Sequence, residues 1–184
     1  MNRTVTESYC ITFEVKVNSS DQPEIDRRME CARQIYNTCL GHCQKLWRKV
    51  RSIQEWRSAL KELQALNRKT ELSSDEKSRQ RALRQQLKAI EQTEGFSEYA
   101  LHAYALTINR HFCSPLGVNE MQKTATFAWR AFKRYRFGNA KKVRFKRRGA
   151  PITIENKSNA TGLRLKSDKV LWGGKHTRTL EFPI

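Results

Sequence analysis

The residues with the clearest chemical meaning lie between Arg130 and Arg148, here called the basic segment. It holds ten lysines and arginines and no acid among nineteen residues. Cations neutralise phosphates, while aromatic rings stack on bases, so this pattern favours nucleic-acid binding with a salt-dependent affinity. The alternative is that the aromatic residues are core and the cations merely solvated. The cations are Arg130, Lys133, Arg134, Arg136, Lys141, Lys142, Arg144, Lys146, Arg147 and Arg148, and the aromatic neighbours are Trp129, Phe132, Tyr135, Phe137 and Phe145.

The charge of the whole chain points to the same kind of partner. The 184 residues include 36 Lys+Arg against 18 Asp+Glu, which gives a net charge of +18. Such an excess predicts a polyanionic partner. A second basic surface is expected on the first long helix, unless that helix is an ordinary amphipathic one. No run of about 18 apolar residues is present, so no membrane-spanning segment is expected.

Residues for catalysis are hard to find. A metal-dependent nuclease needs two or three carboxylates that converge on Mg²⁺. The four aspartates (Asp21, Asp26, Asp75 and Asp168) are scattered, and Asp21, Asp75 and Asp168 occupy positions typical of helix starts or turns. There is no Ser/His/Asp signature and no phosphate-cradling glycine loop. The sequence therefore predicts a binding protein without catalytic residues or a cofactor.

The five cysteines do not form a zinc pattern. Cys39 and Cys43 lie one helical turn apart with His42 between them, but no second Cys/His pair has zinc spacing. We therefore expect small buried thiols on a helix face and no metal site. An odd number of cysteines without a signal peptide indicates reduced thiols in a cytoplasmic protein.

Helical periodicity dominates the middle of the chain. Asp21 is a suitable N-cap for a first helix that extends to Val50, and a second helix is expected from Ile53 to Leu66 after a kink. Further helices are expected from a Ser73/Glu76 capping box to Gly95, after Ser97 to Phe112, and from Asn119 and Gln122 to Gly138.

Extended patterns are found at both ends. Residues 9–17 alternate apolar and polar side chains, which predicts a strand. After Gly138, strands are expected near 143–145, 152–154 and 180–182, and a hairpin is expected with its turn at Ser167-Asp168. A lone strand is not stable, so the first strand must pair with the last ones. The expected fold is α+β, with about five helices inserted into a small split β-barrel or sheet. The domains are then a split β domain (1–20 and 138–184) and a helical lobe (21–137).

Several segments resemble one known group of proteins. The segments are 32–40, 128–135 with the following Gly138, 143–149, 156–165 and 170–172. In this order and spacing, over residues 9 to 175, they resemble TnpB transposon-encoded nucleases and compact type V CRISPR effectors. The resemblance implies an RNA-guided DNA-binding lobe, with the split β domain as the wedge and the helices as the recognition lobe.

The resemblance also implies partners and limits. Guide RNA and double-stranded target DNA are the expected partners, in a prokaryotic cytoplasm and at the nucleoid when DNA is bound. The chain ends before the nuclease domain of that family would begin, so we expect it not to cut DNA itself. It would then be a fragment, a naturally truncated protein, or a subunit whose nuclease domain comes from a second chain.

The resemblance carries over a small set of binding residues. The expected RNA contacts are Lys141, Lys142, Arg144, Lys146, Arg147 and Arg148. The expected contacts to DNA or its recognition motif are Tyr36, Asn37, Gln122, Thr126, Arg130, Lys133 and Arg134. A core position for Tyr36 and a helix-cap role for Gln122 are the alternatives.

Two other functions remain open from the sequence. A general basic RNA-binding protein would bind heterogeneous RNA. A helical adaptor or inhibitor that docks on an acidic protein would keep its RNA affinity unchanged when Arg144, Lys146 and Arg147 are replaced by alanine.

Overall fold

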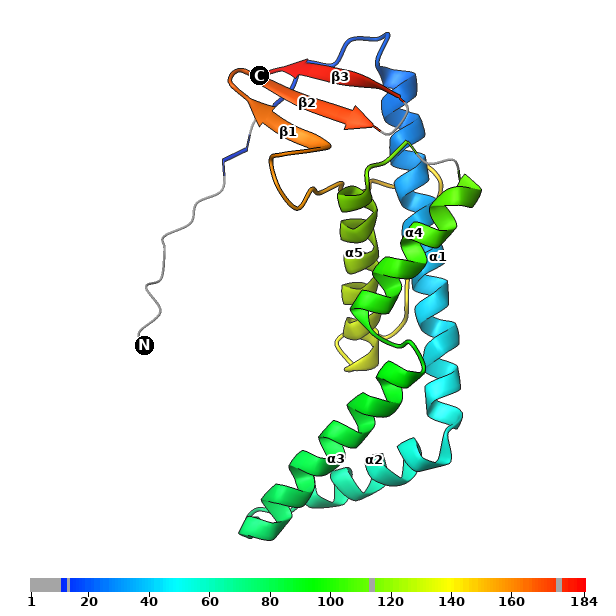
Figure 1. The fold of residues 1–184 in the computed structure, drawn as a ribbon, viewed down its shortest axis with the longest axis vertical. Coiled ribbons are helices and arrows are strands. Elements are labelled where there is room, and N and C mark those ends of the chain that lie inside the picture. The colour runs from blue at the N-terminus through cyan, green and yellow to red at the C-terminus, as the bar shows by residue number, and fades with distance from the viewer. Residues whose placement is uncertain (1–10, 13, 113–114, 175–176) are drawn as a thin grey trace.

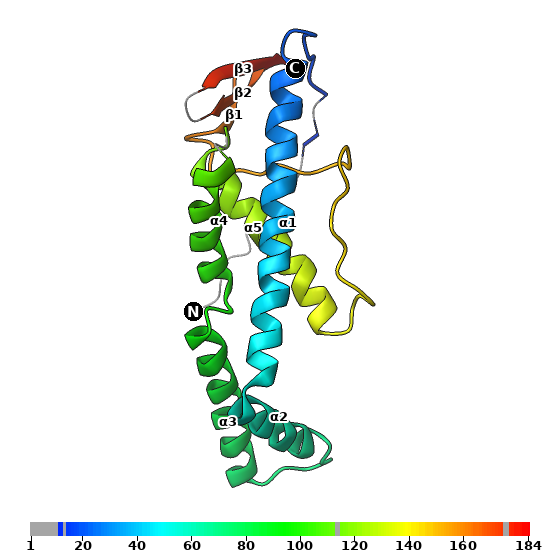
Figure 2. The ribbon, with the colours of Figure 1, turned by 90° about the vertical axis from the view of Figure 1, so that its right-hand side faces the viewer.

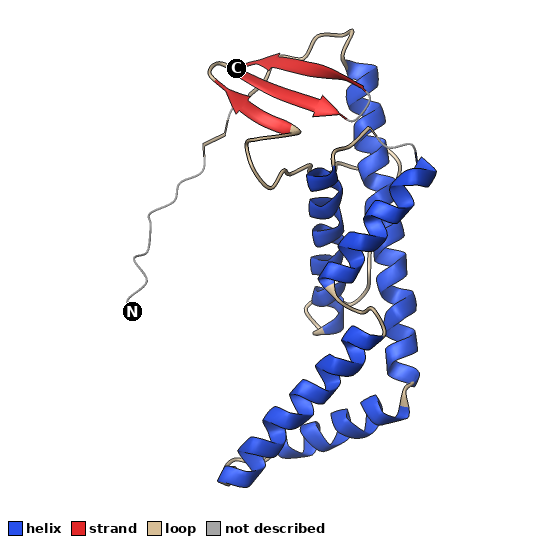
Figure 3. Cartoon of the chain, viewed as in Figure 1, coloured by secondary structure: helices blue, strands red, loops and turns tan. Residues whose placement is uncertain are grey.

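The computed structural model describes residues 11–12, 14–112, 115–174 and 177–184. In this part of the chain, five helices are followed by a three-stranded antiparallel sheet (Figures 1 and 3). The α+β class predicted from the sequence is therefore confirmed. The elements are α1 (Gln22–Ser52), α2 (Gln54–Asn67), α3 (Ser74–Thr93), α4 (Glu98–Phe112), α5 (Val118–Arg136), β1 (Leu163–Lys166), β2 (Lys169–Gly174) and β3 (Thr177–Pro183).

Helix α1 forms the spine of the molecule and packs against both α5 and α4 (Figure 2). Its contact face is apolar, with Ile35, Cys39 and Leu40 fully buried, as the 3.6-residue periodicity predicts. The expected kink is a break at Ile53, whose backbone is extended (φ −71°, ψ 125°). The chain turns sharply there into α2.

Helices α2 and α3 form a hairpin that projects from the end of α1 (Figure 1). Leu63, Leu83 and Leu87 are buried in it. The predicted capping box is present, since the Glu76 amide donates to Ser73 Oγ at 3.2 Å and the Ser73 amide donates to the Glu76 carboxylate at 2.9 Å. Gly95 follows α3 with φ +70°, a conformation that favours glycine.

Helix α5 begins earlier than expected from Asn119 and Gln122. Gly117 is the N-cap, and its amide donates to the Glu120 carboxylate at 2.8 Å. A carboxylate at the third helical position satisfies a free backbone amide in this way, so Glu120, and not Gln122, completes the cap. The other end is as predicted, because Gly138 follows the helix with φ +78°.

An aromatic cluster fills the junction between α1, α5 and the turn that joins α3 to α4. Phe96 lies 4.9 Å from Trp129 and 5.6 Å from Phe132, between ring centroids. Trp47 reaches the same cluster, 5.4 Å from Phe96. The predicted core positions of Trp129 and Phe132 are thus confirmed, and these two rings are not available to nucleic acid.

The sheet has the order β1-β2-β3. The predicted hairpin is confirmed, with Leu163 opposite Trp172 and Leu165 opposite Val170. Ser167 occupies its turn with φ +52°. The last predicted strand is confirmed as β3, whose Leu180 and Phe182 are buried.

The predicted split barrel is not seen in the described residues. Residues 9, 10 and 13 lie outside them, and 11, 12 and 14–17 form no strand, although the Lys16 amide donates to Pro183 O at 3.0 Å. Residues 143–145 and 152–154 also form no strand. The alternation there has another cause: Val143, Ile152 and Ile154 pack on the core from an extended loop. A chain that crosses a helix surface buries every second side chain just as a strand does.

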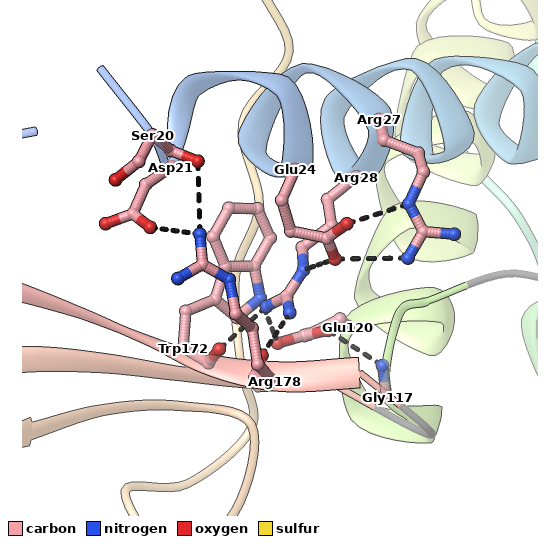
Figure 4. Close-up of polar contacts among 9 residues, drawn as sticks. All are labelled: Ser20, Asp21, Glu24, Arg27, Arg28, Gly117, Glu120, Trp172 and Arg178. Atoms are coloured by element: carbon pink, nitrogen blue, oxygen red, sulfur yellow. Dashed lines mark hydrogen bonds and ion pairs between the residues drawn. The ribbon is translucent and has the colours of Figure 1, made fainter. Parts of the chain in front are cut away.

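A buried arginine joins the sheet to the helices (Figure 4). Arg28 is fully buried in α1. Its Nη1 donates to Trp172 O at 2.7 Å and its Nη2 to Arg178 O at 2.8 Å, while Nε donates to the Glu24 carboxylate at 2.8 Å. The guanidinium also lies 4.9 Å from the Trp172 ring centroid. One side chain of α1 therefore holds both β2 and β3.

Glu120 completes this junction from α5 (Figure 4). It is fully buried and accepts a hydrogen bond from Trp172 Nε1 at 2.9 Å. Burial raises the pKa of Glu120 above its usual range, against the effect of its hydrogen bonds and of Arg28. Asp21 is the N-cap residue of α1, as predicted, but its side chain makes no capping hydrogen bond, and its carboxylate pairs with Arg178 of β3 instead.

Candidate nucleic-acid interface

The basic segment starts on the last turns of α5. Arg130, Lys133 and Arg134 are exposed and have no hydrogen bond or ion pair within the described part of the chain. Arg136 differs, because it donates to the Glu91 carboxylate at 3.0 Å and lies 4.5 Å from the Trp47 ring centroid. Arg136 therefore joins α5 to α3 and α1, while the other three cations face solvent.

The segment then leaves α5 as a loop, here called the basic loop (138–148). The loop runs back toward the sheet beside α1, on the side away from α4 (Figure 2). Lys141, Lys142, Arg144, Arg147 and Arg148 are all exposed on it. Five of the six predicted RNA contacts thus lie together on an accessible loop.

The backbone of the basic loop is fixed to α1 at one point. Asn37 Nδ2 donates to Lys146 O at 2.9 Å, and the Lys146 amide donates to Asn37 Oδ1 at 2.8 Å. Arg33 Nη1 also donates to Lys146 O, at 3.0 Å. These contacts do for Lys146 what a neighbouring strand would do, which explains why the loop needs no strand partner.

The side chain of Lys146 turns back onto the protein. Its Nζ donates to Pro151 O at 2.6 Å and lies 5.7 Å from the Tyr36 ring centroid. The neighbouring Phe145 is 49% exposed, and its ring edge lies against Gly41 of α1. Lys146 therefore positions the loop, whereas Phe145 presents half of its surface to solvent.

Four of the predicted DNA contacts are buried or bonded to other groups of the protein. Tyr36 is buried in the core, and burial raises the pKa of its phenol. Thr126 is buried and bonds to Glu98 and to His102, each at 2.8 Å. Gln122 accepts a hydrogen bond from Lys157, and Asn37 clamps Lys146. Arg130, Lys133 and Arg134 are the predicted DNA contacts that are free, so DNA contact by all seven stays a prediction.

An ion pair on α1 holds Arg33, one of the two residues that bind the backbone of Lys146. Glu30 accepts from Arg33 Nε at 2.7 Å. This hydrogen bond lowers the pKa of Glu30 to about 2, and the charge of Arg148 adds to the effect. Arg33 is therefore held in place to bind Lys146 O. In the sequence Arg33 is one of several cations of the first helix, and its role depends on Lys146, which is distant in sequence.

A groove of about 810 Å³ borders the basic loop, between the first turns of α1 and residues 148–152. Arg148 lines one side, and Asp26, Arg27 and Glu30 line the other. Its charges are mixed, so the groove adds no net positive charge to the basic loop.

The expected second basic surface on α1 is reduced. Arg28 is buried, Arg27 pairs with Glu24, and Lys49 pairs with Glu94. Lys45, Arg48 and Arg51 remain exposed. Within the described residues α1 therefore lacks a continuous cationic face.

Cys39 and Cys43 are buried in the helical core, as predicted. Burial raises the pKa of both thiols to about 12. Among the described residues no group of three or more His, Cys, Asp or Glu side chains is placed to hold a metal ion. No described helix combines the length and apolarity needed to cross a membrane.

Comparison of the chain with protein-family models, with curated proteins and with solved structures finds no match.

Proposed function

We propose that this chain is an RNA-binding module that holds a structured RNA on its basic segment. Following the resemblance described above, it is the guide-RNA-binding and target-DNA-binding lobe of an RNA-guided system. The observation that carries the proposal is the availability of charge. The side chains of eight of the ten cations make no hydrogen bond or ion pair with the described protein, and Arg136 and Lys146 are the exceptions.

The anchoring of the basic loop supports this proposal. Asn37 and Arg33 fix the backbone at Lys146, between the exposed side chains of Arg144 and Arg147. A fixed backbone lowers the conformational entropy that the loop loses on binding. The hydrogen bonds at Lys146 therefore favour a loop with a defined binding surface over a loop whose charges are merely solvated.

The chemistry of the loop favours RNA over an acidic protein. Phe145 is half exposed and lies between Arg144 and Lys146 in the sequence. An aromatic ring flanked by cations suits an unstacked base next to its phosphates. An acidic protein surface would be recognised through the cations, whereas stacking on a base uses both the cations and the ring.

The test removes five charges at once from the basic loop. The loop variant is K141Q/K142Q/R144Q/R147Q/R148Q, and a matched control, K45Q/R51Q/K61Q/R68Q/K166Q, removes five exposed charges elsewhere. We expect the loop variant to lower the slope of log affinity against log salt for a structured RNA by about 3 to 4. The control changes the slope by about 1 or less. Equal slopes for the two variants, with circular dichroism spectra unchanged, would disprove the proposal.

A further inference from the structure

A line of cations on α3 lies outside the basic segment and has no role in the function proposed above. Residues 77–90 contain five cations and no acid. Four of them recur at intervals of 4, 3 and 4 residues, so they share one face of the helix within an arc of about 60° and extend over about 16 Å. We call this set the α3 stripe: Lys77, Arg81, Arg84 and Lys88.

The cations of the stripe are free. All four are exposed, and none of their side chains makes a hydrogen bond or ion pair within the described residues. Arg79 provides the contrast, because it lies on another face of α3 and donates to the Glu62 carboxylate of α2 at 2.6 and 2.8 Å. The cation of α3 that faces α2 is thus neutralised, while the stripe is not.

Solvation alone does not explain why the unpaired cations of α3 all lie on one face of the helix. The other exposed face of α3 is uncharged and carries Ser78, Ala82, Gln85 and Ala89. Like charges three or four residues apart destabilise a helix. The stripe contains three such pairs, and no acid of α3 lies between them. An external anion would remove this repulsion.

The position of the stripe separates it from the basic loop. The α2–α3 hairpin projects from one end of α1, whereas the sheet lies at the other end (Figures 1 and 3). The hairpin is held by its buried leucines and by contacts with α1 at its base. The basic loop is held at Lys146 by Arg33 and Asn37, in the middle of α1, so the stripe and this held part of the loop lie on different elements.

We infer that the α3 stripe binds the phosphate backbone of double-stranded RNA. A single strand is a poorer fit, because α3 has no aromatic residue on which bases could stack. Duplex RNA is recognised mainly through its shape and its phosphates, which a row of cations can contact. The spacing of the stripe, about 4.5 to 6 Å per step, follows the closely spaced phosphates of an A-form strand better than those of B-form DNA. This goes beyond the proposed function, since it assigns a second surface on another element.

The test uses a blunt 24-base-pair RNA duplex of arbitrary sequence as the probe. The stripe variant is K77Q/R81Q/R84Q/K88Q, and its control is K45Q/K61Q/R68Q/K166Q, which has the same net charge. Glutamine preserves helix propensity, so α3 should remain folded. We expect the stripe variant to lower the salt slope by about 3, and the control by about 1 or less. Equal slopes for the two variants would overturn the inference.

Two further measurements test whether the stripe contacts phosphates and whether it prefers RNA to DNA. The charge-preserving variant K77R/R81K/R84K/K88R should bind the RNA duplex within about twofold of the wild type, and a loss as large as that of the glutamine variant would contradict a phosphate contact. A DNA duplex of the same sequence should lose less affinity than the RNA duplex, and an equal or larger loss would overturn the assignment to RNA. The loop variant of the preceding section, measured in parallel, separates the two surfaces, because each inference can then fail while the other stands.

Discussion

Asn37 and Lys146 are 109 residues apart in the sequence and hold each other by two hydrogen bonds, one in each direction. The amide of Asn37 substitutes for the edge of a strand and pairs with both the N–H and the C=O of Lys146. This contact places the basic loop on α1. An uncharged residue of α1 thereby positions a charged loop.

Replacing Asn37 by alanine should release the basic loop. Both backbone groups of Lys146 lose a partner, so we expect a loss of about 1–3 kcal/mol in the free energy of unfolding. Urea denaturation measures this loss, and limited trypsin digestion measures the opening of the loop at its lysines and arginines. Asn139→Ala is the matched control, since Asn139 is exposed in the same loop and makes no side-chain bond. If the Asn37→Ala protein were as stable in urea and as resistant to trypsin as this control, Asn37 would not hold the basic loop on α1.

Replacing Arg28 by methionine should destabilise the whole fold. Trp172 O and Arg178 O lose their donors, and Glu24 and Glu120 lose a nearby positive charge. We expect a cost of about 3–5 kcal/mol in urea denaturation. Arg27→Met is a sharp control, because Arg27 pairs with the same Glu24 but is half exposed, and it should cost at most about 1 kcal/mol. Similar costs for the two variants would show that the buried junction does not hold the sheet.

The stability of the protein should fall in acid partly through Glu30. Its pKa is lowered from 4.5 to about 2 in the folded state. A lowered pKa means that the ionised form stabilises the fold above pH 4.5, and that this contribution is lost as the pH falls from 4.5 toward 2. The urea midpoint of the wild type should therefore drop further over this window than that of Glu30→Gln. The control Glu71→Gln, at an exposed loop position, should behave as the wild type. A Glu30→Gln curve parallel to the wild-type curve would argue against the ion pair with Arg33.

The thiols of Cys39 and Cys43 should be unreactive in the folded protein. A pKa of about 12 leaves very little thiolate at pH 8, and both side chains are buried. Alkylation with iodoacetamide followed by peptide mass spectrometry should label them only after addition of urea. Labelling of either thiol in native buffer, at the rate seen in urea, would contradict their place in the core.

The helices were predictable because their signals are local. The 3.6-residue apolar period, the Ser73–Glu76 box and the glycines at 95 and 138 all act within a few residues, and each is found in the structure. The 163–172 hairpin is local as well, with two short strands about one turn. The strands predicted at 143–145 and 152–154 are absent. Alternation of apolar and polar side chains shows only that one side of the chain is buried, and here helices bury that side in place of a neighbouring strand.

The site was predictable only in part. The run of cations is visible in the sequence, but which cations are free depends on distant partners. Arg136 is neutralised by Glu91, and Lys146 is turned inward by Pro151 and Tyr36. In the sequence Arg28 is one of several basic residues of the first helix, and only the folded sheet shows why it is buried. No local pattern contains these relationships.

The measurement that tests the central claim most directly is the identity of the RNA that accompanies the protein. The chain would be purified from its native host at moderate salt, with the loop variant K141Q/K142Q/R144Q/R147Q/R148Q in parallel, and the bound RNA sequenced. We predict one abundant structured RNA with a variable end, present with the wild type and depleted with the loop variant. A heterogeneous mixture of ribosomal and messenger fragments, or equal RNA recovery with both proteins, would contradict the account.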